Sequence, residues 1–200
     1  MTAFALPVSR QKFDLPPAVR IVAGAASAAI LLLSLYALLR WMLGFAPATP
    51  WVKDVALAVH LGTVIPAIPL GAYVILARKG GSRHKSLGKI WLALMFVTAF
   101  STLFIRNINA GNFSWIHLLT LLTFVAVPQA ILTARQGRIE EHKKHLRNFF
   151  FGSLIIAGIT AFAPGRTMWQ WAFASPVAEA ASGPGAGIAP DARVRGAFRA

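Results

Sequence analysis

The chain contains five apolar runs, and short spacers that carry Lys or Arg separate them. The runs cover residues 21–39, 55–77, 87–105, 113–134 and 148–164. A helix needs about 20 apolar residues to cross the hydrocarbon core of a bilayer, and most of the runs reach or approach that length. Hydrophobic residues make up 56% of the sequence and charged residues 13%, which is too apolar for an ordinary soluble domain. The sequence therefore predicts an all-α, polytopic membrane protein with five transmembrane helices.

The two ends of the chain differ from these runs in composition. We expect residues 1–19 to form a cytoplasmic N-terminal arm, residues 20–174 the transmembrane domain, and residues 175–200 a disordered tail rich in Ala, Gly and Pro. The first run begins after two prolines and is too long for a cleavable signal peptide. It is therefore expected to remain as a helix.

Basic residues are unevenly distributed among the spacers. Residues 1–20, 78–89 and 135–147 hold thirteen Lys and Arg residues, whereas the other connections hold only Arg40, Lys53 and Arg106. Cytoplasmic loops are enriched in such residues. We therefore predict that the protein lies in the cell (inner) membrane, with its N-terminus on the cytoplasmic side and its C-terminus outside. The net charge of +14 is then explained by topology and by anionic lipid at the basic loops, and nucleic acid is not an expected partner.

Two stretches of the sequence repeat one another. The matched positions are His60 and His117, Thr63 and Thr120, Arg78 and Arg135, Gly80 and Gly137, and His84 and His142. The spacing from the first His to the Arg is 18 residues in both stretches. This pattern predicts a duplicated helical hairpin, residues 55–105 and 113–164, which forms a four-helix core beside the N-terminal helix. Two such units would be related by a two-fold axis along the membrane normal.

Equivalent residues of a two-fold repeat lie at equal depth, so the first histidine pair is expected to face the axis. His60 and His117 lie inside their spans, where ionisable residues are rare and usually face the bundle interior. Facing imidazoles are the axial ligands that a b-type haem takes. The alternative is that both rings lie close enough to the interface to reach water.

The second pair, His84 and His142, lies near the cytoplasmic surface, with His145 one turn after His142. It would form a second site only if the third and fifth helices extend inward to cover it. A solvated basic loop beside lipid phosphates is the favoured interpretation. A metal site made by these histidines with Glu141 is a further alternative, although a His-x-x-His spacing is a weak signal.

Two resemblances bear on function. The placement of two histidine pairs on four helices is similar to that of diheme transmembrane b-type cytochromes, which implies haem b and electron transfer with a quinone or a small reductant. The local motifs resemble more closely an uncharacterised bacterial family of small multi-pass membrane proteins, a domain of unknown function. They are His60, the run His84-Lys85-Ser86-Leu87-Gly88, and Arg135-Gln136-Gly137 leading to His142-Lys143. This second resemblance covers about residues 55–165 and implies no established activity.

The remaining function classes are narrowed by what the sequence lacks. It contains no Cys, which excludes disulfides and thiolate metal sites, and it shows no glycine-rich phosphate loop. The alternative to a haem protein is a non-catalytic membrane subunit or a membrane protein that binds a lipid or solute. Whether the chain is an enzyme stays open.

Overall fold

The computed structural model describes residues 15–48, 55–105 and 116–176, which are helices joined by turns and contain no strand. The elements are α1 (Pro17–Met42), α2 (Val55–Leu76), α3 (Ser82–Thr102), α4 (Ile116–Arg135), α5 (Ile139–Phe149), the π-helix η3 (Phe150–Ile156), α6 (Ala157–Ala161) and α7 (Thr167–Phe173). The prediction of an all-α protein is confirmed for this part of the chain. The expectations for the arm before residue 15 and the tail after residue 176 lie outside the described residues.

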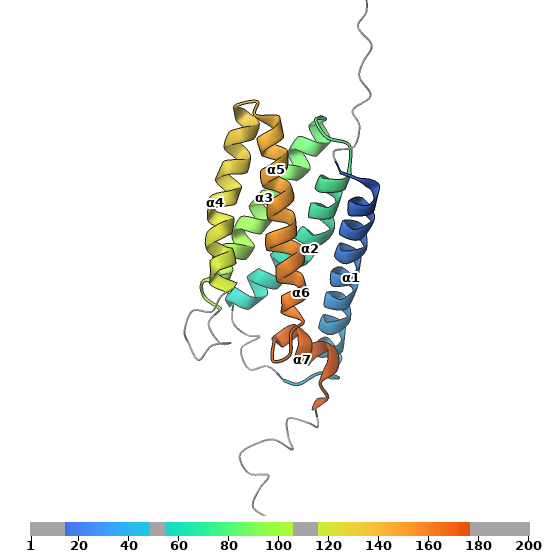
Figure 1. Cartoon of the computed structure of the whole chain (residues 1–200). Helices are drawn as coiled ribbons and strands as arrows, with labels where there is room; N and C mark the ends of the chain where they lie inside the picture. The colour runs from blue at the N-terminus through green and yellow to red at the C-terminus, as the bar shows by residue number, and fades with distance from the viewer. Residues whose placement is uncertain (1–14, 49–54, 106–115, 177–200) are drawn as a thin grey trace, which may run out of the picture.

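The long helical segments pack side by side, and α5, η3 and α6 follow one another as a single rod (Figure 1). α2 and α4 run in one direction, and α3 and α5–α6 return in the other. The turns that join α2 to α3 and α4 to α5 lie at the same end as the start of α1, whereas α7 lies at the opposite end. We call the first end the basic end, because both turns are flanked by Lys and Arg.

Three helices are long and apolar enough to cross a membrane: α1, α2 and residues His117–Arg135 of α4. Large apolar side chains on them are exposed; Ile21 is 71% exposed, Val55 75% and Leu118 68%. A continuous apolar exterior of this kind is expected of a surface that faces lipid. The coarse prediction of a multi-pass membrane protein is therefore supported by length and composition.

The two remaining long segments begin earlier than the sequence predicts. α3 starts at Ser82 rather than at residue 87, and the last segment starts at Ile139 rather than at residue 148. Their first turns carry charged residues, so a search for continuous apolar runs leaves these turns out. The turns are nevertheless helical, and α5 buries Leu146 and Phe149 on one face. The favoured placement of His84 and His142 in solvated loops is therefore wrong, because both lie on helices.

The fully buried side chains of Trp91, Phe150 and Val74 lie on α3, η3 and α2 and belong to one core cluster. Trp91 is fully buried and lies against Phe149 and Phe150, with ring centroids 5.6 and 6.4 Å away. Gly71 on α2 allows this approach, since a Cβ there would lie 2.5 Å from the indole nitrogen of Trp91. The absence of a side chain at residue 71 therefore sets how closely α2 and α3 pack.

The segment after residue 164 folds back across the end of α1 as α7. Trp171 is fully buried and stacks on Trp41 with ring centroids 5.0 Å apart. The Arg40 guanidinium donates to the carbonyl oxygens of Trp171 (2.9 Å) and Ala174 (3.2 Å). α7 is thus held to α1 at the end of the bundle away from the basic end.

Candidate functional site

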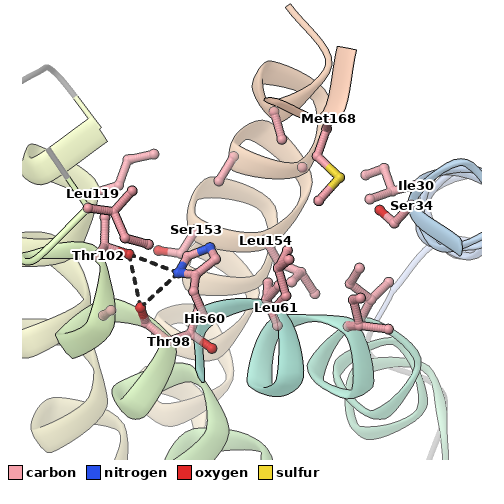
Figure 2. Close-up of a pocket in the computed structure, with 18 of the residues that line it drawn as sticks. Ile30, Ser34, His60, Leu61, Thr98, Thr102, Leu119, Ser153, Leu154 and Met168 are labelled. Carbon is pink, nitrogen blue, oxygen red and sulfur yellow. Dashed lines mark hydrogen bonds between the residues drawn. The ribbon is translucent and has the colours of Figure 1, made fainter. Parts of the chain in front are cut away.

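A cavity of about 200 Å³ lies among the long helical segments, in the half of the bundle away from the basic end. Most of the side chains that line it are apolar (Figure 2). The polar exceptions are Ser34, His60, Thr98, Thr102, Thr120, Thr123, Ser153, Arg166 and Thr167. An apolar chamber with a few converging polar groups is the usual form of a small-molecule site.

His60 is held against α3 by three contacts to one ring nitrogen. Its Nδ1 lies 3.2 Å from the carbonyl oxygen of Thr98, 3.3 Å from Ser101 Oγ and 3.2 Å from Thr102 Oγ1. The Ser101 and Thr102 hydroxyls donate to the same Thr98 carbonyl, at 2.7 and 2.9 Å. Three groups of α3 thus converge on one edge of the ring.

This arrangement assigns the tautomer of His60. The Thr98 carbonyl can only accept, and the two hydroxyls already donate to it, so the proton of the neutral ring belongs on Nδ1. The other nitrogen, Nε2, is then an acceptor. Figure 2 shows it pointing away from α3, on the side where Ser153 lies. His60 therefore presents a lone pair to the cavity.

Ser153 adds a hydroxyl to the same region. It is 9% exposed, and its Oγ has no hydrogen-bond partner within the described structure. Ser153 lies in η3, a seven-residue π-helix, and such irregular turns recur at functional sites because they change which side chains face inward. Thr123 on α4, in contrast, satisfies its hydroxyl on the carbonyl of Leu119 at 2.9 Å. The His60 Nε2 acceptor and the unpartnered Ser153 hydroxyl thus both belong to the lining of the cavity.

The structure does not bring His117 to this cavity beside His60. On α4 the cavity is lined by Thr120, which is 3% exposed, and His117 lies one turn nearer the start of that helix. The cavity is thus lined by one histidine of the first pair, His60, and the facing of both rings toward one axis stays a prediction.

This geometry does not suit a haem held between His60 and His117. Axial ligation needs both rings on opposite sides of one iron, and only one of them lines the cavity. Drug-sized ligands occupy pockets of about 300–1,000 Å³, and a porphyrin needs at least as much room. The chamber of about 200 Å³ is smaller than that.

A second, smaller cavity of about 40 Å³ lies at the basic end. It is lined by Leu15, Val74, Ile75, Lys79, His84, His142, Lys143, Leu146 and Arg147. The His142 Nδ1 lies 2.8 Å from the carbonyl of Ala130 and donates to it, whereas the His84 Nδ1 is buried and has no hydrogen-bond partner among the described residues. The structure therefore brings together the second histidine pair, although the sequence favoured the first.

Burial and nearby positive charge both lower the pKa of His84. The pKa of His84 lies below its ordinary value, mainly because burial penalises the charged ring and also because His142 and Lys79 add positive charge nearby. His145 does not line this cavity, and Glu141 accepts a hydrogen bond from Arg138 instead. Within the described ranges no three His, Cys, Asp or Glu residues are placed to hold a metal ion, so the proposed cluster with Glu141 is not assembled.

Sequence reasoning missed the polar residues that position His60. Thr98, Ser101 and Thr102 follow i, i+3, i+4 spacing within an apolar helix, and this spacing marks one inward face. That signal was available. Ser153 carried none, because its inward direction depends on a π-helix that no simple periodicity predicts.

Comparison with known proteins agrees with the local motifs. No curated protein and no solved structure matches the chain. A family model described as "Predicted membrane protein (DUF2306)" matches residues 57–177, which is more than half of the 200-residue chain. The match begins within α2 and continues through α7, and so includes all five histidines and most of the residues that line the two cavities. The chain therefore belongs to this family of predicted membrane proteins of unknown function.

Proposed function

We propose that the protein binds, within its membrane bundle, a small and largely apolar molecule that carries a hydroxyl group, for example a quinol. The observation that carries the proposal is the orientation of His60. Its Nδ1 is occupied by α3, and its Nε2 is left as an acceptor on the side of the cavity where Ser153 lies.

A ligand hydroxyl satisfies both polar atoms at once. It donates to the His60 Nε2 and accepts from the Ser153 Oγ, which has no partner of its own. A buried polar atom without a partner costs about 1–3 kcal/mol, so such a ligand gains affinity by supplying the missing bonds. A quinone carbonyl accepts from Ser153 but cannot donate to Nε2. The site therefore prefers the reduced, hydroxylated form.

The surrounding wall selects against charge. Apart from its few polar groups, the chamber is formed by Leu, Ile, Val, Met and Ala side chains from several helices. Transfer of an ion into such surroundings is costly unless it is paired, and Arg166 is the one charged residue among the described residues of the lining. A small aromatic body gains about 25 cal/mol for each Å² of apolar surface that it buries. The ligand is accordingly small and largely apolar.

The proposal includes a topology in which five helices cross the bilayer, with the basic end in the cytoplasm. α3 and α6 expose large apolar side chains to the outside of the bundle, such as Phe100 (52%) and Ile159 (61%). Only Arg40 and Arg166 among the described basic residues lie toward the opposite end. The remaining eleven lie toward the basic end: Arg20, Arg78, Lys79, Arg83, Lys85, Lys89, Arg135, Arg138, Lys143, Lys144 and Arg147. Such a bias is typical of the cytoplasmic side.

Binding of a short-chain quinol to the purified protein in detergent tests the proposal. The His60→Asn side chain can still donate to Thr98 but has no acceptor at the Nε2 position. We expect its dissociation constant to rise about 5- to 150-fold, which corresponds to about 1–3 kcal/mol. The matched control is His117→Asn, the same substitution at the repeat-equivalent position outside the cavity. Equal affinities of the two variants would contradict the proposal.

The same preparation separates the alternatives. If the protein binds haem, protein expressed with ample haem shows absorption bands in its reduced-minus-oxidised spectrum. These bands would disappear in His60→Asn and His117→Asn. We expect no such bands, because the cavity does not fit a porphyrin held by both rings. A folded protein that binds neither haem nor any hydroxylated apolar compound would favour a non-catalytic membrane subunit.

A further inference from the structure

We propose that the small cavity at the basic end is a binding site for a phosphate group, held by His84, His142 and the basic side chains around them. The site is separate from the larger cavity and does not depend on the function proposed for it.

The lining of this cavity is strongly cationic. Five of its nine residues are His, Lys or Arg: Lys79 after α2, His84 on α3, and His142, Lys143 and Arg147 on α5. Leu15, the first described residue, lies before α1 and also lines the cavity. Among the described residues, no acidic side chain lines it. Within the described ranges the acidic residues are Glu140 and Glu141, which pair with Lys143 and Arg138.

The nitrogen atoms are arranged to donate. The Nδ1 of His142 donates to the Ala130 carbonyl, which leaves the Nε2 of this ring for a ligand. The Nδ1 of His84 is buried without a hydrogen-bond partner within the described structure. A protonated His84 with Lys79 and Arg147 supplies the charge-assisted donors that a phosphate binds.

The start of α3 adds to this preference. His84 lies in the first turn of this 21-residue helix, which has no side-chain cap hydrogen bond at Gly81 and no acidic residue in its first turn. The N-terminus of a helix carries a partial positive charge, and its first backbone N–H groups have no partner within the helix. A phosphate beside His84 is attracted by this partial charge and accepts hydrogen bonds from these N–H groups.

The size and surroundings of the cavity restrict the ligand. A volume of about 40 Å³ admits a single small group and not a nucleotide. Val74, Ile75 and Leu146 form an apolar wall beside the basic side chains. The same phosphate chemistry is found in a lipid headgroup, whose acyl chains would lie along the bundle, and in free inorganic phosphate.

Protonation and binding are coupled at this site. Without an anion, burial and the charges of His142 and Lys79 hold the pKa of His84 down. A bound phosphate reverses the sign of the local charge, so it raises that pKa and binds more tightly as the pH falls. A site made of lysine and arginine alone would bind phosphate more weakly at pH 5.5, because the charge of phosphate itself falls from about −2 toward −1 between pH 7.5 and 5.5.

The experiment measures thermal stabilisation of the purified full chain in detergent. One arm titrates inorganic phosphate at pH 5.5 and 7.5, with chloride at equal ionic strength as the comparison. The other arm adds phosphatidylglycerol or phosphatidylcholine. The variants are His84→Ala and His142→Ala, and His145→Ala is the control, since His145 is on the same helix but does not line the cavity.

We expect the apparent dissociation constant for phosphate to be at least tenfold lower at pH 5.5, and this advantage to disappear in His84→Ala and His142→Ala but not in His145→Ala. Stabilisation by phosphatidylglycerol alone, with the same dependence on His84 and His142, would assign the phosphate to a lipid headgroup. The proposal is overturned if neither phosphate nor lipid stabilises the wild-type protein, if chloride acts as strongly, or if the three variants behave alike.

Discussion

The packing of α2 against α3 can be tested at a single atom. In Gly71→Ala, the new Cβ would lie 2.5 Å from the Trp91 Nε1, 2.8 Å from its Cε2 and 3.2 Å from the Leu154 Cδ2. Ordinary contact begins near 3.4 Å, so the closest of these distances is about 0.9 Å too short. Trp91 is fully buried and packed against Phe149, and therefore cannot turn aside. The helices must move apart instead.

Overpacking of this kind costs about 1–3 kcal/mol. In a protein of this size, 1 kcal/mol shifts the midpoint of thermal unfolding by about 2–4 °C, so Gly71→Ala is expected to lower it by roughly 2–12 °C. The matched control is Gly62→Ala on the same helix, where nothing lies within 4 Å of the new Cβ. Its midpoint is expected to stay the same or rise slightly, because Ala is the better helix former. Near-ultraviolet circular dichroism of the indole signal during heating in detergent measures both. An equal midpoint for the two variants would refute the close approach of Gly71 to Trp91.

Three other predictions follow from topology, burial and charge. Reporter fusions after Gly80 and Gly137 are expected to read cytoplasmic and one after Asn109 external, and opposite readings at the first two positions would contradict the parallel hairpins. Ser153→Ala is expected to leave the unfolding midpoint unchanged or slightly raised, because it removes a buried hydroxyl without a hydrogen-bond partner in the described structure. A clearly lower midpoint would show that the Ser153 hydroxyl has a hydrogen-bond partner. In phosphate-free buffer, stability is expected to fall as the pH drops below about 6.5, since the unfolded chain binds a proton to His84 more readily than the folded chain. Thermal scans should show a flatter pH dependence for His84→Gln.

The sequence predicts the apolar helices well and their polar extensions poorly. The first predicted span, residues 21–39, lies within α1, and the second, residues 55–77, agrees closely with α2. Both helices contain long apolar runs, so a hydropathy pattern finds them. α5 begins instead with a charged, amphipathic turn, and its helical state depends on the burial of Leu146 and Phe149. An apolar window cannot detect that contribution from tertiary packing.

The candidate site was predicted only in part, for a related reason. His60 was identified because an ionisable residue inside an apolar run is conspicuous. Its partners on α3 were not, because serine and threonine are common in membrane helices and signal an inward face only through their spacing. The direction of a side chain toward a particular neighbour depends on helix rotation, which composition does not determine. The sequence therefore identified the residue but not the contact.

The contacts between α3 and α5 support the proposed repeat at the basic end. The two hairpins align with an offset of 58 residues at their second histidines, which pairs His84 with His142 and Trp91 with Phe149. The two histidines line one cavity, and the rings of Trp91 and Phe149 lie 5.6 Å apart. Residues related by a two-fold axis touch one another only when they lie next to that axis. If the hairpins are a duplicated unit, these two pairs would place its axis between α3 and α5.

The π-helix explains why this equivalence ends before the larger cavity. With the same offset, Leu154 in η3 corresponds to Phe96 on α3, yet Leu154 is 3% exposed and Phe96 41%. Ile156 corresponds to Thr98, and here the order is inverted, at 52% and 6%. A π-helix has wider turns than an α-helix, so side chains beyond its start point in directions that α3 does not share. At the basic end, the second histidine pair lines one small cavity. Beyond the start of the π-helix the exposure of matched positions differs, and the larger cavity receives an imidazole from α2 and a hydroxyl from η3.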